Sequence, residues 1–133
     1  IDETRARGVE VEGDIDLTPQ LSASAAYTFT DAIDLATEAQ LLRQPKHQGT
    51  AILSYAPTER LSLAATLIVN GRENDTPAPN DGFVRLDLRA AWALTDQLEL
   101  YGRVENAADA DYQDVSGYGE PGLAAYGGVR VRL

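Results

Sequence analysis

Side chains that could carry acid–base or metal chemistry are few in this chain. His47 is its only histidine, and beside Lys46 it is more simply a solvated residue than a catalytic base or a metal ligand. Asp109, Asp111 and Asp114 could offer oxygen ligands to Ca²⁺, but the segment lacks the glycine and the terminal glutamate of an EF-hand loop. The chain has no cysteine, which excludes thiol catalysis and thiolate metal sites. We therefore expect no enzyme activity, no cofactor and no bound metal.

The secondary-structure elements that would position any polar site are indicated first by the pattern of residues 9–17. Their odd positions are apolar or glycine, whereas every even position is acidic: Glu10, Glu12, Asp14 and Asp16. A period of two is that of a β-strand with two different faces. Soluble strands average about 5 to 6 residues, and a strand that crosses a bilayer at a tilt needs about 9 to 11. The segment is therefore predicted to be a strand long enough to span a membrane.

The same alternation returns in residues 21–30, 48–55, 61–70, 84–92, 98–105 and 123–133. No apolar run approaches the ~20 residues of a membrane helix, and no helical period is sustained. The fold predicted from these patterns is all-β, with about seven long antiparallel strands connected up and down. If such a chain lies in a membrane, it can do so only as part of a β-barrel, because open sheet edges are not tolerated in lipid.

The connections between these segments alternate between short and long. Residues 16–20, 56–60 and 94–97 are predicted to be tight turns, whereas residues 31–45, 71–81 and 107–121 are long and polar. Short turns on one side and long loops on the other are typical of an outer-membrane barrel, whose short turns lie in the periplasm. This pattern predicts that the C-terminus lies at the periplasmic rim.

Aromatic and charged residues fit the same two faces. Tyr27 and Phe29 fall near the loop end of the apolar face, and Tyr55 and Trp92 near its turn end, as at the two interfaces of a membrane. The polar face carries five charged residues on the fifth and sixth strands that are placed for cross-strand ion pairs: Arg85, Asp87, Arg89, Arg103 and Glu105. The net charge of −10 argues against nucleic acid as a partner, and it is also an ordinary aid to solubility.

Residues 100–112, LYGRVENAADADY, are followed by Gly117-Tyr118-Gly119, by Pro121-Gly122 and by a closing strand. This arrangement resembles the C-terminal end of TonB-dependent outer-membrane receptors. Residues 5–10 resemble the Gly-Val-Glu strand opening of that family, and residues 41–47 look closest to its cobalamin-transporter branch. The family usually ends in Phe, a feature of the signal read by the barrel-assembly machinery, whereas this chain ends in Leu133, which puts efficient assembly in question.

The resemblance implies a barrel of about 22 strands around a plug. Residues 1–133 would then be a single C-terminal segment of an incomplete barrel, with the plug and the TonB-contacting part upstream. The implied function is uptake across the bacterial outer membrane of a scarce metal-containing ligand, cobalamin or a ferric siderophore. The implied partners are outer-membrane lipid, the remaining strands and plug of the same receptor, TonB, and a small metal chelate.

Six residues in the long connections are candidates for contact with such a ligand, because each has long polar or aromatic reach: Arg43, Arg72, Asn74, Asp75, Tyr112 and Tyr118. The family resemblance itself identifies none of them.

Three other interpretations stay open from the sequence alone. One is a soluble acidic β-domain of the binding or adhesin type. A second is a β fragment that self-associates through its open strand edges and has no transport activity of its own. A third is an enzyme on a barrel scaffold, in which a Ser–His pair would have to use His47.

Overall fold

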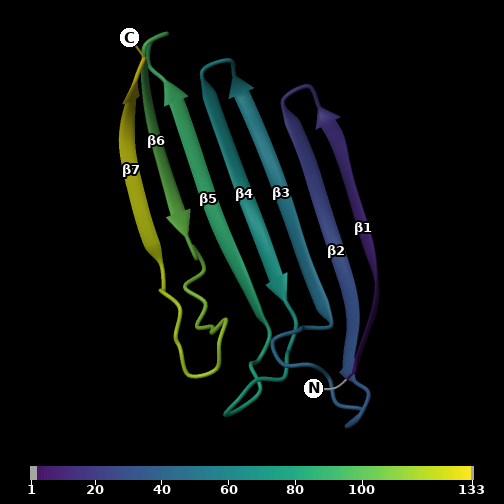
Figure 1. Cartoon of the computed structure of the whole chain (residues 1–133). Helices are drawn as coiled ribbons and strands as arrows, with labels where there is room; N and C mark the ends of the chain where they lie inside the picture. The colour runs from purple at the N-terminus through teal and green to yellow at the C-terminus, as the bar shows by residue number, and fades with distance from the viewer. Residues whose placement is uncertain (1–2, 133) are drawn as a thin grey trace.

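The computed structural model describes residues 3–132, which form one antiparallel sheet of seven strands in sequence order (Figure 1). Leu133 and the expectation placed on it lie outside the described residues. Within the described part of the chain there is no helix long and apolar enough to cross a bilayer. The strands are β1 (Thr4–Thr18), β2 (Leu21–Asp34), β3 (His47–Thr58), β4 (Leu61–Asn70), β5 (Phe83–Ala93), β6 (Leu98–Glu105) and β7 (Ala124–Val131).

The predicted strands are confirmed, and the first two are longer than their alternation suggested. β1 has 15 residues and β2 has 14, which exceeds the ~11 that a tilted crossing requires. The extension arises because Thr4 pairs with Asp34 and Arg7 with Asp31, so the backbone ladder continues past Val9 and Phe29, the last pair of large apolar residues. The first hairpin therefore projects beyond the apolar part of the sheet at its loop end.

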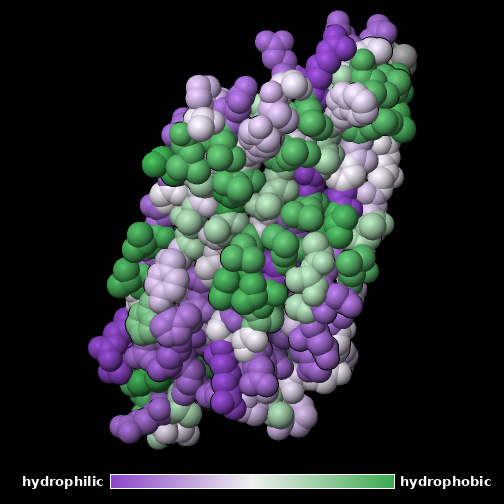
Figure 2. Space-filling model, turned by 180° about the vertical axis from the view of Figure 1, so that it is seen from behind, coloured by the Kyte–Doolittle hydropathy of each residue, from purple (hydrophilic) through white to green (hydrophobic). Residues whose placement is uncertain are grey.

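Pairing places most apolar residues of the seven strands on one face, whereas Ile52 and Ile68 lie on the other, opposite Thr66 and Thr50. Ala25 lies opposite Ala51, and Leu67 lies opposite Leu86. Figure 2 shows this face, with hydrophobic residues across its middle and hydrophilic residues at the loop end. Many of its side chains are more than half exposed, including Ile15 at 59%. An apolar surface of this size on a monomer is typical of contact with lipid or another protein.

Almost no hydrophobic core lies on the other side of the sheet. Among residues 3–132, only Ala32 and Tyr112 are buried hydrophobic residues. The opposite face is lined by hydroxyl, amide and charged side chains, as the alternation predicted. Burial of the apolar face must therefore come from the surroundings of the sheet rather than from a second layer of the same chain.

Ion pairs on the polar face correct one expectation. Arg85 pairs with Asp87 at 2.8 Å and Arg103 with Glu105 at 3.4 Å, so both pairs lie along a strand and not across two strands. The reason is the β5–β6 register, which sets Arg89 opposite Arg103 and thus puts two like charges together. The cross-strand pair that does form joins Glu99 of β6 to Arg130 of β7.

The short connections lie at one edge of the sheet and each is built on a threonine. The Thr58 Oγ1 accepts hydrogen bonds from the backbone N–H groups of Arg60 and Leu61, and the Thr95 Oγ1 plays the same part in the β5–β6 turn. Such side-chain bonds to the following backbone favour tight turns. β7 ends at this edge, where the Arg132 N–H donates to the Gln97 carbonyl, so the end of the described chain lies on the turn side.

Gly128 shows why the last strand carries glycine. It pairs with Tyr101 of β6, and a Cβ added at Gly128 would collide with the Tyr101 ring. The ring covers the glycine on the polar face, an arrangement that protects a bare strand backbone.

Candidate functional site

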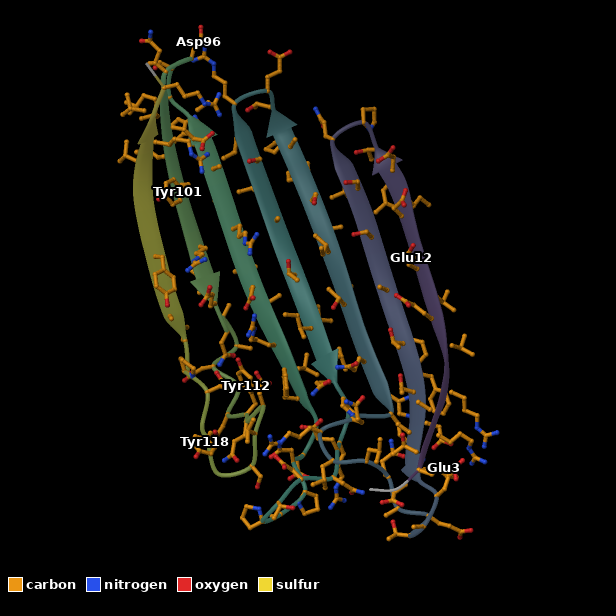
Figure 3. The ribbon with its side chains drawn as sticks, viewed as in Figure 1. Glu3, Glu12, Asp96, Tyr101, Tyr112 and Tyr118 are labelled. Atoms are coloured by element: carbon orange, nitrogen blue, oxygen red, sulfur yellow. The ribbon has the colours of Figure 1, made fainter. Side chains whose placement is uncertain are left out.

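Three long loops gather at the edge opposite the turns (Figure 1). They are loop 1, residues 35–46; loop 2, residues 71–82; and loop 3, residues 106–123. Figure 3 shows Tyr112 and Tyr118 at this edge and Asp96 at the turn edge. All six predicted ligand-contacting residues therefore lie at one end of the molecule, and the structure divides them into two kinds.

Asp75 of loop 2 joins all three loops. Its carboxylate accepts the Ser116 N–H of loop 3 at 2.7 Å and the Thr76 N–H at 2.8 Å, and it pairs with the Arg43 Nε of loop 1 at 3.1 Å. The Asp75 side chain is fully buried by these neighbours. Hydrogen bonding to the charged form, above all from the Ser116 N–H and then from Thr76 and Arg43, holds the pKa of Asp75 below its ordinary value.

Arg43 and Asn74 strengthen the link between loops 1 and 2. The Arg43 N–H donates to the Asn74 carbonyl at 2.8 Å, and the Asn74 side-chain amide donates to the Gln40 carbonyl at 3.4 Å. Leu42 and Asn74 also form an isolated parallel bridge. Three of the predicted contacts, Arg43, Asn74 and Asp75, are thus brought together, and in this structure they hold the loops to one another.

Asn106, to which sequence reasoning gave no role of its own, fastens the base of loop 3. It is 2% exposed, and its side chain donates to the Ala110 and Pro121 carbonyls while accepting the Ala110 N–H. Its φ of 50° is one that Asn tolerates better than most residues. The signal in the sequence was an Asn directly after a strand, inside the stretch that resembled a receptor terminus.

Tyr112 connects loop 3 to the polar face of β5. Its hydroxyl accepts a hydrogen bond from Arg85 at 3.0 Å, and its ring lies 4.3 Å from that of Phe83, centroid to centroid. Arg85 also donates to Asp87, whose second oxygen accepts the Asn106 N–H. Tyr112 is buried in this network, so its contacts are made within the chain.

Arg72 and Tyr118 are exposed and enter none of the described hydrogen bonds between the loops, whereas Arg43 and Asn74 are also exposed but are held by such bonds. The Arg72 side chain is 71% exposed and only approaches Asp81, at 3.9 Å. Tyr118 is 72% exposed, and its described hydrogen bond is made by its backbone N–H to the Val115 carbonyl. These two side chains are free to meet a molecule that approaches the loop edge.

The inner wall below the loops is polar and aromatic at β6 and β7. The Arg103 guanidinium lies 4.4 Å from the centre of the Tyr126 ring, and the Arg130 guanidinium lies 5.4 Å from that of Tyr101. Glu10, Glu12, Asp14 and Asp16 of β1 enter none of the ion pairs found within residues 3–132. The wall is therefore acidic at one side of the sheet and rich in arginine at the other.

His47 begins β3 on the apolar face, away from this wall. Its Nδ1 is hydrogen-bonded to the Tyr27 hydroxyl at 2.7 Å, and its ring lies 5.3 Å from that of Phe29. This position does not bring His47 to the loop cluster or to a serine of the polar face.

Across residues 3–132, the geometry brings together no group of three or more His, Cys, Asp or Glu side chains suited to a metal ion. The Asp109 carboxylate instead accepts the Leu123 N–H at 2.9 Å and closes loop 3.

Comparison with known proteins gives a consistent family. A family model described as "TonB dependent receptor-like, beta-barrel" matches residues 1–107. The chain is 30% identical to the vitamin B12 transporter of Photobacterium profundum, with 84% of this chain and 19% of that protein covered. It is also 30% identical to the iron-regulated outer membrane virulence protein of Vibrio cholerae, with 98% and 22% covered. The chain thus spans about a fifth of the length of these relatives.

Solved structures show the same fold. A copper transporter superposes with a TM-score of 0.82 at 19% identity, over 96% of this chain and 24% of that one. The ferripyoverdine receptor of Pseudomonas aeruginosa superposes with a TM-score of 0.79 at 19% identity, over 96% and 19%.

The broad exposed apolar face and the family match together rule against the soluble adhesin-type alternative. Long strands, short turns at one edge and long loops at the other complete the pattern of an outer-membrane barrel. The chain belongs to the β-barrel domain family of TonB-dependent receptors, and its strands are those of a bacterial outer-membrane protein.

Proposed function

We propose that the protein to which these strands belong takes up a scarce metal-containing ligand across the outer membrane, either cobalamin or a ferric siderophore. Its relatives include a transporter named for vitamin B12 and a protein named as iron-regulated, which supports both ligand classes equally. The step is transport without covalent chemistry, energised through TonB.

The observation that carries this proposal is the union of the three loops at Asp75. A ligand that binds to one loop contacts a surface that is connected to the other two loops through Asp75. All three loops can therefore contribute to ligand binding. Arg72 and Tyr118 supply exposed cationic and aromatic reach on that surface. An anionic, partly aromatic chelate fits these two groups by charge and by stacking.

The partners follow from the same proposal. β1 and β7 are the edges of the sheet, and further strands of the same barrel would pair with their free backbone groups. A plug would fill the polar interior, and the acidic row of β1 and the arginines of β6 and β7 would face it. In this proposal, these strands and the plug would belong to the four-fifths of the relatives' length that this chain does not span.

Uptake by whole cells tests the proposal. The full-length protein is expressed in a Gram-negative strain that lacks its own cobalamin and siderophore receptors, and uptake of radiolabelled cyanocobalamin and of a panel of radiolabelled ferric siderophores is measured. We expect uptake of one of these ligands that disappears when TonB is deleted. Absence of TonB-dependent uptake for every ligand, in cells where the folded protein reaches the outer membrane, would overturn the proposal.

A further inference from the structure

The apolar face of the sheet, which faces outward in a barrel, has charged side chains at only one place along its strands. Along β1–β7, the charged side chains directed outward by the register are Arg5, Arg7 and Asp31, all at the loop end of the first hairpin. Lys46, directly before β3, reaches the same place, because its Nζ lies 3.1 Å from Asp31. These four residues, named here the hairpin patch, carry three positive charges and one negative charge. The local excess is notable in a chain with a net charge of −10.

The hairpin patch follows directly on the aromatic limit of the apolar face. On β2, Tyr27 and Phe29 precede Asp31 on the same face, and the His47 ring lies against Phe29. Rings of this kind mark the level of the lipid headgroups. Arg7 lies one outward position beyond Val9, and Arg5 lies two beyond, which places them about 7 and 13 Å further along the strand. The basic side chains therefore stand at headgroup height or just above it.

The cations of the hairpin patch keep free hydrogen-bond donors. Asp31 is held between Lys46 at 3.1 Å and Arg7 at 3.6 Å, and its side chain is only 20% exposed. By contrast, the Arg7 side chain is 68% exposed and that of Lys46 is 48% exposed. Asp31 thus fixes the two cations side by side without neutralising both. Guanidinium and ammonium donors in this spacing suit the oxygens of a phosphate group.

We infer that Arg5, Arg7 and Lys46 bind the phosphate of a lipid headgroup in the outer leaflet. Charge complementarity selects this occupant, since the patch is cationic, faces outward, and lies where the apolar face meets the headgroups. The outward face of β4–β7 has no charged residue that could offer a second such position. The inference rests on the membrane position of the strands and not on which ligand is transported.

The test is lipid binding by the full-length protein in a neutral detergent, measured by native mass spectrometry. The probe is dioleoyl phosphatidic acid, and dioleoylglycerol provides the same acyl chains without phosphate. We expect the Arg5→Gln/Arg7→Gln variant, which keeps the Lys46–Asp31 pair, to lose about fivefold in affinity for each cation removed. Asp31→Asn should raise the affinity about fivefold, because one opposing charge is removed.

The matched control is Arg60→Gln/Arg132→Gln, which removes the same number of charges at the turn edge, where both side chains are exposed. This control should bind phosphatidic acid as the wild type does. Equal losses in the patch variant and the control, equal binding of dioleoylglycerol, or full displacement of the lipid by inorganic phosphate would each overturn the inference. Migration of unboiled samples on gels verifies folding. If the double variant does not fold, Lys46→Gln makes the same comparison.

Discussion

Replacing Asn106 by alanine should release the base of loop 3 while leaving the sheet intact. The substitution removes two well-formed hydrogen bonds, at 2.9 Å to the Ala110 carbonyl and at 2.8 Å from the Ala110 N–H. Each contributes about 1 kcal/mol net to stability. Alanine held at a φ of 50° adds about 1 kcal/mol of backbone cost. The two hydrogen bonds and the backbone cost together give a loss of about 3 kcal/mol. The longer bond to the Pro121 carbonyl, at 3.4 Å, is not included in this value.

This loss is measured by hydrogen–deuterium exchange of the purified full-length protein. Local opening of residues 106–123 should become roughly 150-fold more frequent, since each 1.36 kcal/mol is a factor of ten. Asn106→Gly is the matched control, because glycine accepts the positive φ without strain but makes neither bond. It should accelerate exchange roughly 30-fold, from the two lost bonds alone. Exchange in loop 3 that changes less than threefold in Asn106→Ala, or that stays at the wild-type rate in Asn106→Gly, would refute the reasoning.

Two further predictions address the loop union and the apolar face. Because the pKa of Asp75 is held below its ordinary value of 3.8, its ionised form contributes stability that is fully present above that pH and is lost as the pH falls through the lower, folded-state value. Hydrogen-exchange protection of residues 71–82 should therefore be constant from neutral pH to about 5 and should drop in stronger acid. Asp75→Asn should weaken this protection at neutral pH and abolish the drop. If the wild type and the variant have the same pH profile, the role given to Asp75 is contradicted. Leu67→Arg, on the outward face of β4, should destabilise the folded barrel by about 2 to 4 kcal/mol, whereas Thr66→Arg, one residue away on the polar face, should be tolerated. The free energy of unfolding of both variants is measured by urea titration in lipid vesicles. Equal losses of stability would show that the two faces are not exposed to different surroundings.

The strands were predictable because a two-faced sheet repeats its chemistry at every second residue. The alternation of residues 61–70 and 98–105 gave the bounds of β4 and β6 as the structure has them. It is less informative at residues 4–8 of β1, because Arg5 and Arg7 there occupy the odd positions that are apolar or glycine in residues 9–17. Backbone pairing with β2 holds this part in the sheet, and the projecting hairpin is therefore not predicted by the apolar pattern.

The loop contacts were beyond sequence reasoning for a different reason. Arg43 and Asp75 are 32 residues apart, and they meet only because β3 and β4 bring the ends of loops 1 and 2 together. Both side chains are long and polar enough to contact a ligand, but the Asp75 carboxylate has three donors nearby and is satisfied within the chain. The prediction of ion pairs across β5 and β6 is wrong, because the observed pairs lie along each strand and the register of the two strands cannot be read from composition.

The residues that made the family recognisable are therefore those that hold the loops in shape. In the stretch that resembled a receptor terminus, Asn106 and Tyr112 are buried and hydrogen-bonded, and Asp109 closes loop 3. Their contacts are made within the chain, so these residues act on the shape of loop 3 and not directly on a ligand. In the proposed uptake function, a ligand would instead meet exposed side chains that take no part in the contacts between the loops, such as Arg72 and Tyr118. Exchanging Arg72 or Tyr118 should alter ligand preference with loop protection unchanged, whereas exchanging Asn106 should alter loop protection first. Measuring both properties on the same variants separates the scaffold of the loop edge from its specificity.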